Sequence, residues 1–239
     1  MNNDAYARPF VLSCRNLTKR YGPILALNDV TFDLPPGRIV GLLGPNGSGK
    51  TTFIKLVTGL LRPSAGEISV YGMPVSPESK AVISYLPDRI CLEPWMRVRD
   101  ALDFYEDFYS DFYKDAALEM LKNLTIDPEN RIKTLSKGNK EKVQLVIVMS
   151  RKAKLYLLDE PIGGVDPAAR DYIINTILAN YNKNAAVLIS THLIQDVEQI
   201  LDDIIFLKNG RVVLEGNAEE IRAEKEKTID SLFREVFRC

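Results

Sequence analysis

The residues best suited to chemistry begin with an octapeptide at positions 44–51 that fits the pattern G-x-x-x-x-G-K-[ST]. It lies between an apolar stretch expected to form a strand and one expected to form a helix, which is the setting that this pattern requires. The glycines let backbone N–H groups converge on phosphate oxygens, and the helix N-terminus adds the positive end of its dipole. We expect a nucleoside triphosphate to bind here, through Gly44, Pro45, Asn46, Gly47, Ser48, Gly49, Lys50, Thr51 and Thr52.

Two residues of this phosphate loop have more specific expected roles. Lys50 would supply a positive charge to the β- and γ-phosphates, and the Thr51 hydroxyl would ligate Mg²⁺. A chance glycine-rich turn is a remote alternative in this strand–loop–helix setting. A dinucleotide site is also disfavoured, because the glycine spacing does not match G-x-G-x-x-G.

A pair of acids, Asp159 and Glu160, follows the apolar strand expected at residues 154–158. An unpaired charge at the end of a buried strand is costly to desolvate, so the pair calls for a functional reason. Asp159 would face Mg²⁺ through water, and Glu160 would polarise the water that attacks the γ-phosphate. Solvated loop acids are the weaker alternative beside a phosphate loop, and we therefore expect hydrolysis as well as binding.

The only histidine of the chain, His192, follows the strand expected at residues 185–190. A single histidine is more often structural than catalytic. However, open α/β sheets bind their ligands at the carboxyl ends of parallel strands. From the residues alone both interpretations stay open; in the catalytic one, His192 contacts the γ-phosphate and orients the water.

Strand and helix patterns alternate on both sides of a helix-rich middle, which indicates βαβ units and a mainly parallel sheet. Strands are expected within residues 11–34, with a turn at Tyr21-Gly22-Pro23, and at 38–43, 64–71, 82–86, 154–158 and 185–190. Helices are expected at 50–61, 98–113, 114–124, 137–150 and 168–180, and closing helices at 218–239. The predicted fold is an α/β P-loop NTPase core from residues 1–88 and 151–239, with an antiparallel β portion near 10–35 and 64–72, and an inserted α-helical subdomain at 89–150.

Aromatic residues form a stripe in the helix expected at residues 98–113, where Phe104, Phe108 and Phe112 recur at every fourth position. A stripe with helical spacing is most often part of the hydrophobic core. A docking face for a partner protein is the less frequent alternative.

Charge balance, cysteine positions and the lengths of the apolar runs argue against several classes of protein. Lys plus Arg number 31 and Asp plus Glu number 32, so there is no overall basic excess, and we expect no nucleic-acid partner. Cys14, Cys91 and Cys239 are odd in number and far apart, which argues against a disulfide framework or a zinc site and fits a reducing cytoplasm. The N-terminus does not resemble a signal peptide, and the apolar runs are too short to span a bilayer. We expect a soluble chain.

Together these residues resemble the ATPase family of ABC transporters over nearly the whole chain. The segment that narrows the choice is Leu135-Ser136-Lys137-Gly138-Asn139, which is similar to the family signature LSGGQ. Ser136 suits a helix N-cap, and Gly138 leaves the first turn open to a phosphate. Lys137 and Asn139 stand where the signature has glycine and glutamine. The resemblance implies that this turn closes over ATP held by a second ATPase subunit.

The resemblance also implies roles for residues outside these motifs. Tyr21 corresponds to an adenine-stacking aromatic residue, Asp166 to a residue of the loop that reaches across the dimer, and His192 to the family's switch histidine. Asp88, after Tyr85-Leu86-Pro87, stands where the family commonly has a glutamine that touches Mg²⁺. Because a carboxylate also ligates Mg²⁺, directly or through water, we expect a functional variant.

The function implied is that of the ATP-binding and ATP-hydrolysing subunit of an ABC transporter of the bacterial exporter type, with ATP and Mg²⁺ as cofactors. It would dimerise with an identical or different ATPase subunit and attach to the inner face of the cell membrane through separate transmembrane permease subunits. The alternative is a non-transport ABC-type ATPase. Chromosome-maintenance members need long coiled coils between their motifs, translation-associated members usually carry two cassettes, and a small-molecule kinase would leave the signature turn unexplained.

Overall fold

Two sheets form the centre of the protein, whose computed structural model describes residues 10–163, 165 and 167–237. The antiparallel sheet has the order β2-β1-β4-β5, formed by β1 (Leu12–Tyr21), β2 (Ile24–Leu34), β4 (Ala65–Val70) and β5 (Met73–Pro74). The larger sheet has the order β10-β9-β3-β8-β7-β6, formed by β3 (Ile39–Leu43), β6 (Ile83–Leu86), β7 (Leu155–Asp159), β8 (Ala186–Thr191), β9 (Asp203–Lys208) and β10 (Arg211–Asn217). In this larger sheet of the described residues, neighbouring strands pair in parallel, except for the antiparallel hairpin of β9 and β10.

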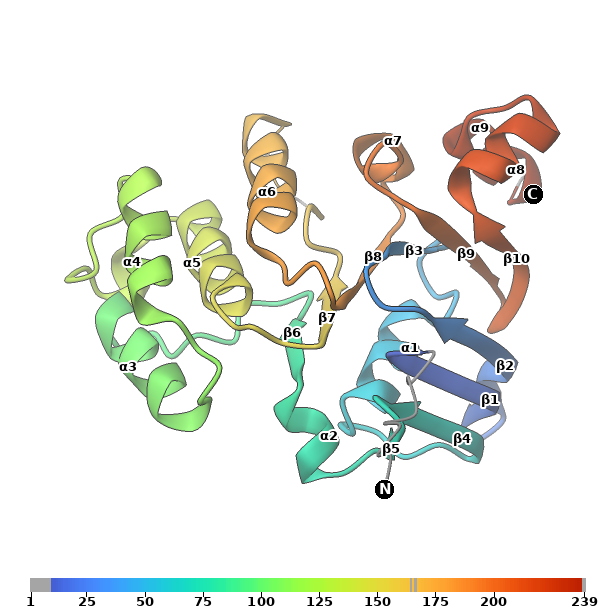
Figure 1. Cartoon of the computed structure of the whole chain (residues 1–239), viewed down its shortest axis with the longest axis horizontal. Coiled ribbons are helices and arrows are strands. Elements are labelled where there is room, and N and C mark those ends of the chain that lie inside the picture. Colours follow the sequence, from blue (N-terminus) through green and yellow to red (C-terminus); the bar gives the residue numbers. More distant parts are fainter. Residues whose placement is uncertain (1–9, 164, 166, 238–239) are drawn as a thin grey trace, which may run out of the picture.

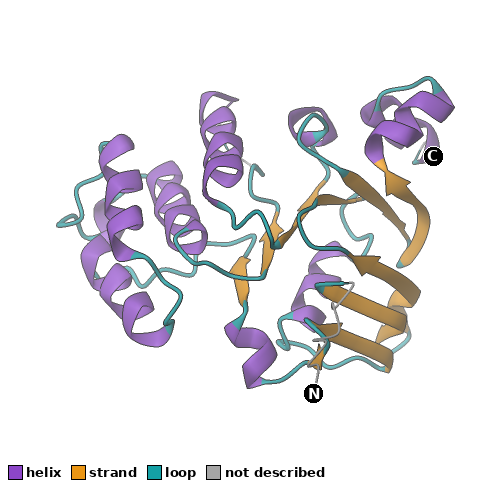
Figure 2. Cartoon of the chain, viewed as in Figure 1, coloured by secondary structure: helices purple, strands orange, loops and turns teal. Residues whose placement is uncertain are grey.

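Helices cover the larger sheet and extend from it (Figures 1 and 2). They are α1 (Lys50–Val57), α2 (Pro77–Ala81), α3 (Val98–Phe108), α4 (Lys114–Asn123), α5 (Lys137–Met149), α6 (Pro167–Asn180), α7 (Ile194–Val197), α8 (Ala218–Lys225) and α9 (Ile229–Val236), with a 3-10 turn at Ile132–Thr134. None of the described helices is long and apolar enough to cross a membrane.

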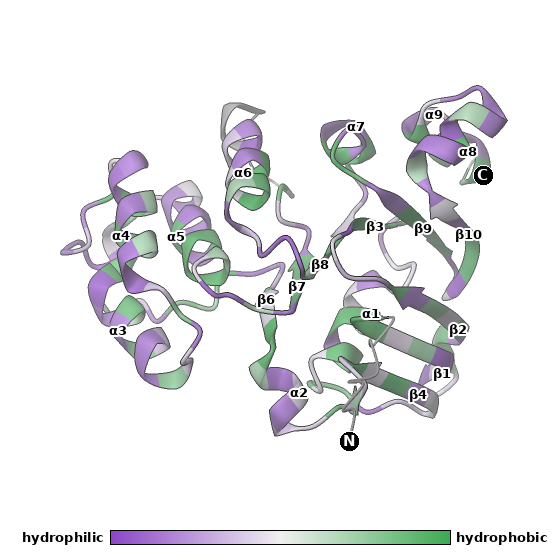
Figure 3. Cartoon of the chain, in the orientation of Figure 1, coloured by the Kyte–Doolittle hydropathy of each residue, from purple (hydrophilic) through white to green (hydrophobic). Residues whose placement is uncertain are grey.

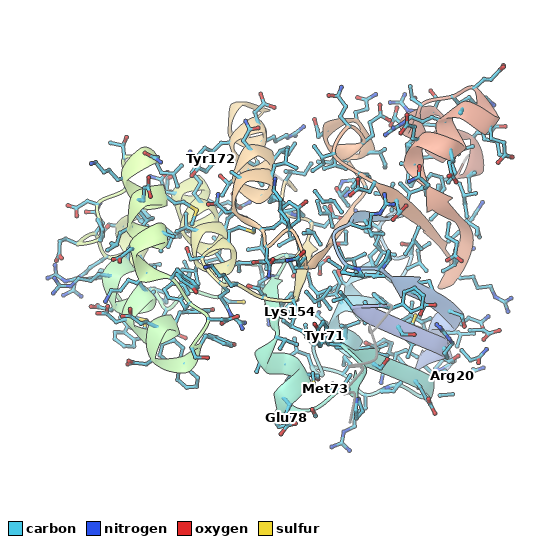
Figure 4. All side chains as sticks on the ribbon, viewed as in Figure 1. Arg20, Tyr71, Met73, Glu78, Lys154 and Tyr172 are labelled. Carbon is cyan, nitrogen blue, oxygen red and sulfur yellow. The ribbon has the colours of Figure 1, made fainter. Side chains whose placement is uncertain are left out.

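The central strands are apolar along their whole length because both faces of the sheet are covered. Every residue of β3, β7 and β8 is buried, and the strands of this sheet appear largely hydrophobic in Figure 3. The antiparallel sheet packs against α1 around Phe32 and Phe53, whose rings lie 4.9 Å apart. The two sheets also meet where the Lys154 ammonium lies 5.9 Å from the Tyr71 ring centroid (Figure 4). The predicted α/β core with its antiparallel portion is confirmed.

Helices α3, α4 and α5 gather at one end of the molecule around a hydrophobic cluster of their own (Figure 1). Helix α5 joins this cluster to the sheet. Its Val146 and Ile147 pack among the helices, whereas Leu145 and Val148 belong to the core around the sheet. A displacement of α5 would therefore disturb the packing of both the helical cluster and the core around the sheet.

Two predicted helices are longer than the helices in the structure. Helix α1 ends at Val57 instead of residue 61, because the Thr58 hydroxyl donates to carbonyls of the last turn and Gly59 takes a φ of +70°. Helix α3 ends at Phe108 instead of residue 113, and Phe112 pairs with Arg151 as an isolated bridge. These are corrections of element ends, not of element types.

The aromatic stripe of α3 is mostly not core. Phe112 is buried, but the side chains of Phe104 and Phe108 are 46% and 69% exposed. Their rings contact one another in a tilted arrangement, with centroids 4.6 Å apart. The interpretation of the stripe as core is therefore wrong for these two residues, and an exposed aromatic pair remains to be explained.

Candidate functional site

The phosphate loop connects β3 to α1, as the sequence pattern requires. Gly49, the residue before the helix, has a φ of +113°, and a Cβ atom there would lie 2.6 Å from the Ala26 carbonyl oxygen. Only glycine fits that position without strain. The neighbouring Ser48 hydroxyl is buried and has no hydrogen-bond partner within the described residues. The loop thus has a polar group available for a ligand.

Lys50 is nearly buried, and its ammonium lies at the centre of the site. It donates to the carbonyl oxygens of Gly44 at 2.7 Å and Pro45 at 3.3 Å. It also forms an ion pair with Glu160, Nζ to Oε1, at 3.4 Å. The phosphates of a bound nucleotide would compete for this ammonium, which links the binding loop directly to the carboxylate at the end of β7.

Asp159 is fully buried at the end of β7. Its Oδ1 accepts hydrogen bonds from the hydroxyls of Ser190 and Thr51, the latter at 3.2 Å. Its Oδ2 is buried without a partner within the described residues. Burial raises the pKa of Asp159, and the charges of Asp88 and Glu160 add to this effect. An unpaired carboxylate oxygen beside a threonine hydroxyl fits a divalent cation.

Glu160 is held in a fixed position by its backbone and by its side chain. Its φ is +50°, which is uncommon for a residue with a side chain, and its N–H donates to the Ser190 carbonyl at 2.9 Å. The carboxylate accepts from the Thr191 hydroxyl at 3.2 Å and lies 3.0 Å from His192 Nδ1. Backbone strain of this kind gathers at functional sites, where the surroundings maintain it.

Asp88 lies in the loop that follows β6, and it is exposed. A small cleft of about 40 Å³ lies between this loop, the middle of α5 and the segment that follows β7, and both Asp88 and Glu160 line it. The charge of Asp88 is close enough to raise the pKa of Asp159. Asp88, Asp159 and Glu160 therefore bring three carboxylates into one region, in which Asp88 is exposed and Asp159 is fully buried.

Other predicted residues lie apart from this centre. Tyr21, at the end of β1, is 44% exposed, and the Lys19 ammonium lies 5.2 Å from its ring centroid. Ser136 caps α5, where its hydroxyl accepts from the Asn139 N–H at 3.2 Å. Lys137 pairs with Glu141 along the same helix, and a Cβ atom on Gly138 would meet open space. The signature turn is thus a bare helix N-terminus; Asp166 and Gly164 lie outside the described residues.

Three residues of the site were not predicted from the sequence. Ser190 and Thr191 hold the two carboxylates, and their signal was two hydroxyls at the end of an otherwise apolar strand. Gln144 lines the cleft beside Glu160 and Asp88, and its signal was one amide within a run of apolar residues on α5.

Comparisons with known proteins agree with this geometry. The family described as ABC transporter matches residues 27–163. The uncharacterized ABC transporter ATP-binding protein YhaQ of Bacillus subtilis is 33% identical over 92% of this chain and 77% of its own. The Nod factor export ATP-binding protein I of Rhizobium etli is 29% identical over 86% of this chain and 68% of its own. A solved ATP-binding subunit of an ABC transporter superimposes with a TM-score of 0.86 at 30% identity, over 95% of this chain and 100% of the other.

Proposed function

The chain belongs to the ABC transporter family, as its ATP-binding and ATP-hydrolysing subunit, and from that premise we propose how its residues carry out the work. The proposed hydrolytic centre consists of Lys50, Thr51, Asp159, Glu160 and His192. The observation that carries it is the direct link from the phosphate loop through Lys50 to Glu160, and from Glu160 to His192. Binding and hydrolysis would then share one connected set of side chains.

Nucleotide binding rearranges the contacts of Lys50 in this proposal. The triphosphate lies along residues 44–52, where the backbone N–H groups, the Ser48 hydroxyl and the dipole of α1 meet it. Tyr21 stacks on the adenine. The Lys50 ammonium exchanges the carbonyls of Gly44 and Pro45 and its ion pair with Glu160 for phosphate oxygens. Glu160 is thereby released to act on water.

Mg²⁺ fits the oxygen atoms that the site presents. The Thr51 hydroxyl and the unpaired Oδ2 of Asp159 would hold the ion, and Asp88 would approach it from the loop after β6. When bound, the ion would neutralise charge on the phosphates. Because Asp159 is already anchored by Ser190, its free oxygen needs little reorganisation to meet a cation.

Glu160 polarises the attacking water, and its neighbours keep it in place. The Thr191 hydroxyl donates to Oε2 of Glu160, and His192 Nδ1 lies within 3.1 Å of both carboxylate oxygens. Because His192 Nδ1 faces Glu160, the other ring nitrogen, Nε2, is left to contact the γ-phosphate.

A second ATPase subunit completes the site. The signature residues Ser136, Lys137, Gly138 and Asn139 form a solvent-facing helix N-terminus whose hydrogen bonds and ion pairs, in the described part of the chain, stay within α5 and its cap. An unfilled helix N-terminus attracts phosphate. In the proposed dimer each signature turn contacts the ATP of the other subunit, with Asp166 in the loop between subunits, and the partner subunit is identical or different.

Separate permease subunits would hold the chain at the inner face of the membrane. The helical unit at residues 89–150 offers them the exposed Phe104–Phe108 pair, which is flanked by Asp103, Glu106 and Asp107. A permease segment with apolar residues for the aromatic pair and basic residues for the flanking acids would suit this surface. The proposed direction of transport is export, because the Nod factor relative is named for export.

Phosphate release with Lys50→Ala tests the hydrolytic centre. The variant should lose nucleotide affinity and hydrolysis together, because the same ammonium serves both. Lys55→Ala, on the same helix but outside the loop, is the matched control and should keep both. Hydrolysis at the wild-type rate by Lys50→Ala would overturn the proposed centre.

A further inference from the structure

Gln144 of the signature helix α5 holds the backbone of the Asp88 loop through both ends of its amide. The Cys91 N–H donates to Gln144 Oε1 at 2.7 Å, and Gln144 Nε2 donates to the Arg89 carbonyl at 3.1 Å. The Gln144 side chain is only 7% exposed. Two backbone groups of one short loop are therefore fixed by a single buried side chain from a different element.

The position of Gln144 connects two parts of the proposed site that are far apart in the sequence. Its helix begins at the Ser136 cap, two turns before it, where the signature turn lies. The loop that it grips begins at Asp88, and both residues line the cleft that also contains Glu160. A shift of α5 would thus pull the loop through Gln144, and a shift of the loop would pull α5.

Other contacts already secure α5 to the sheet without Gln144. The Ser84 hydroxyl of β6 donates to the Val148 carbonyl at 2.8 Å. Arg151, just after the helix, pairs with Asp111 at 2.9 Å and also donates to the carbonyls of Ala81 and Ile83. These contacts lie at the start of β6, whereas Gln144 acts at its far end. Gln144 is therefore not needed to hold the helix on the sheet, but it is well placed to fix the loop.

We propose that Gln144 is a positioning residue that holds Asp88 toward the metal-binding oxygens and couples this loop to the signature helix. The inference rests on the proposed role of Asp88. Because the amide meets backbone groups, the coupling does not depend on the side chains of Arg89 or Cys91. Only a side chain with both an acceptor and a donor makes both hydrogen bonds at once.

The decisive test measures Mn²⁺ affinity by electron paramagnetic resonance, with a non-hydrolysable ATP analogue bound. Mn²⁺ takes the same oxygen ligands as Mg²⁺. Gln144→Met keeps the length of the side chain and removes both hydrogen bonds. We expect it to weaken Mn²⁺ binding by about tenfold, as typical for the loss of an outer-shell partner. Amide exchange at Cys91 should become faster in the same variant.

A double-mutant cycle with Asp88→Ala separates this inference from the proposed role of Asp88. Asp88→Ala alone should also weaken Mn²⁺ binding. The double variant should lose no more Mn²⁺ affinity than the single variant with the larger loss, because the two residues act in series. Unchanged Mn²⁺ affinity in Gln144→Met would overturn the inference. Unchanged affinity in Asp88→Ala, with a loss in Gln144→Met, would overturn the role of Asp88 and the claim that Gln144 acts through it, and would leave only the hold of Gln144 on the loop backbone.

Two controls exclude a general loss of structure. Gln199→Met changes an exposed glutamine and should leave Mn²⁺ affinity unchanged. Thr176→Val removes a buried hydroxyl that bonds within α6, to the Tyr172 carbonyl, and should change thermal stability without changing Mn²⁺ affinity. If Gln144→Met does not fold, Gln144→Leu also removes both hydrogen bonds without adding a charge to the cleft. It should then show the same loss in Mn²⁺ affinity, and an unchanged affinity would count against the inference.

Discussion

At the scale of single residues, Asp159 has a proposed function and also a buried charge that should destabilise the fold. It is fully buried, and its Oδ2 has no hydrogen-bond partner in the described part of the chain. A buried charged oxygen without a partner destabilises a fold, so its retention calls for a ligand that supplies what the protein does not. The carboxylate of Glu160, by contrast, contacts Lys50, Thr191 and His192.

Asp159→Asn should therefore make the metal-free chain more stable while abolishing hydrolysis. The substitution keeps the acceptor for Ser190 and Thr51 and removes the buried charge. We expect the free energy of unfolding at neutral pH to rise, because a neutral amide is less costly to bury than an ionised carboxylate. Urea unfolding and phosphate release measure the two effects; a variant less stable than the wild type at neutral pH would contradict this account.

The gain should depend on pH in a defined direction. Because burial raises the pKa of Asp159 above its ordinary value of 3.8, the folded chain binds this proton more tightly than the unfolded chain. The penalty of the ionised carboxylate is present above the folded-state pKa and fades as the pH falls through it toward 3.8. The stability difference between Asp159→Asn and the wild type should shrink over that interval, and a difference that grows on acidification would contradict the prediction.

At the scale of elements, α5 carries the signature turn at its start and joins two hydrophobic cores along its length. Its first turn is exposed, and Gly138 leaves it bare. Because this turn is open to solvent, a substitution in it can disturb the proposed contact with a second subunit without destabilising the helix.

Gly138→Ala should leave thermal stability unchanged or slightly higher, because a Cβ atom meets open space and alanine favours the helix by up to about 1 kcal/mol. ATP-stimulated self-association and hydrolysis should nevertheless fall, since the methyl group stands where a phosphate would approach. ATP binding by the single chain is the internal control and should not change. Full self-association in the variant would remove the signature turn from the dimer contact.

The sequence predicted the types of most elements, because short apolar runs between glycines and prolines have few alternatives in an α/β chain. The end of α3 could not be predicted in this way, since residues 109–113 keep helical spacing. Tertiary contacts end the helix instead. The Arg151 guanidinium lies 3.7 Å from the Tyr109 ring centroid and pairs with Asp111, which draws this segment out toward β6.

The candidate site was predictable only where local pattern determines it. The phosphate loop and the two acids at the end of β7 lie in motifs, so their neighbours in the chain define them. The pairing of Glu160 with Lys50 and His192, and the grip of Gln144 on the Asp88 loop, join residues from different strands and helices. No local pattern contains those distances.

At the scale of the whole molecule, the exposed Phe104–Phe108 pair marks a surface that the single chain does not use for its own core. Replacing both residues by serine should change the free energy of unfolding by no more than about 0.5 kcal/mol, as is usual for surface positions. Binding of the chain to inverted membrane vesicles from its own cells should be lost. Phe112→Ser is the matched control within the same stripe, because its buried ring should make it strongly destabilising. Normal vesicle binding by the double variant would exclude this surface as the docking face.

The central claim, that Glu160 drives hydrolysis in an ATP-bound dimer, is tested most directly by sedimentation of Glu160→Gln with Mg-ATP alongside phosphate release. The variant keeps the size of the side chain and weakens the contacts with Lys50 and His192. We predict that it binds ATP, releases no phosphate and accumulates as a dimer, whereas the wild type returns to monomer as ATP is consumed. Phosphate release by Glu160→Gln at the wild-type rate would contradict the account.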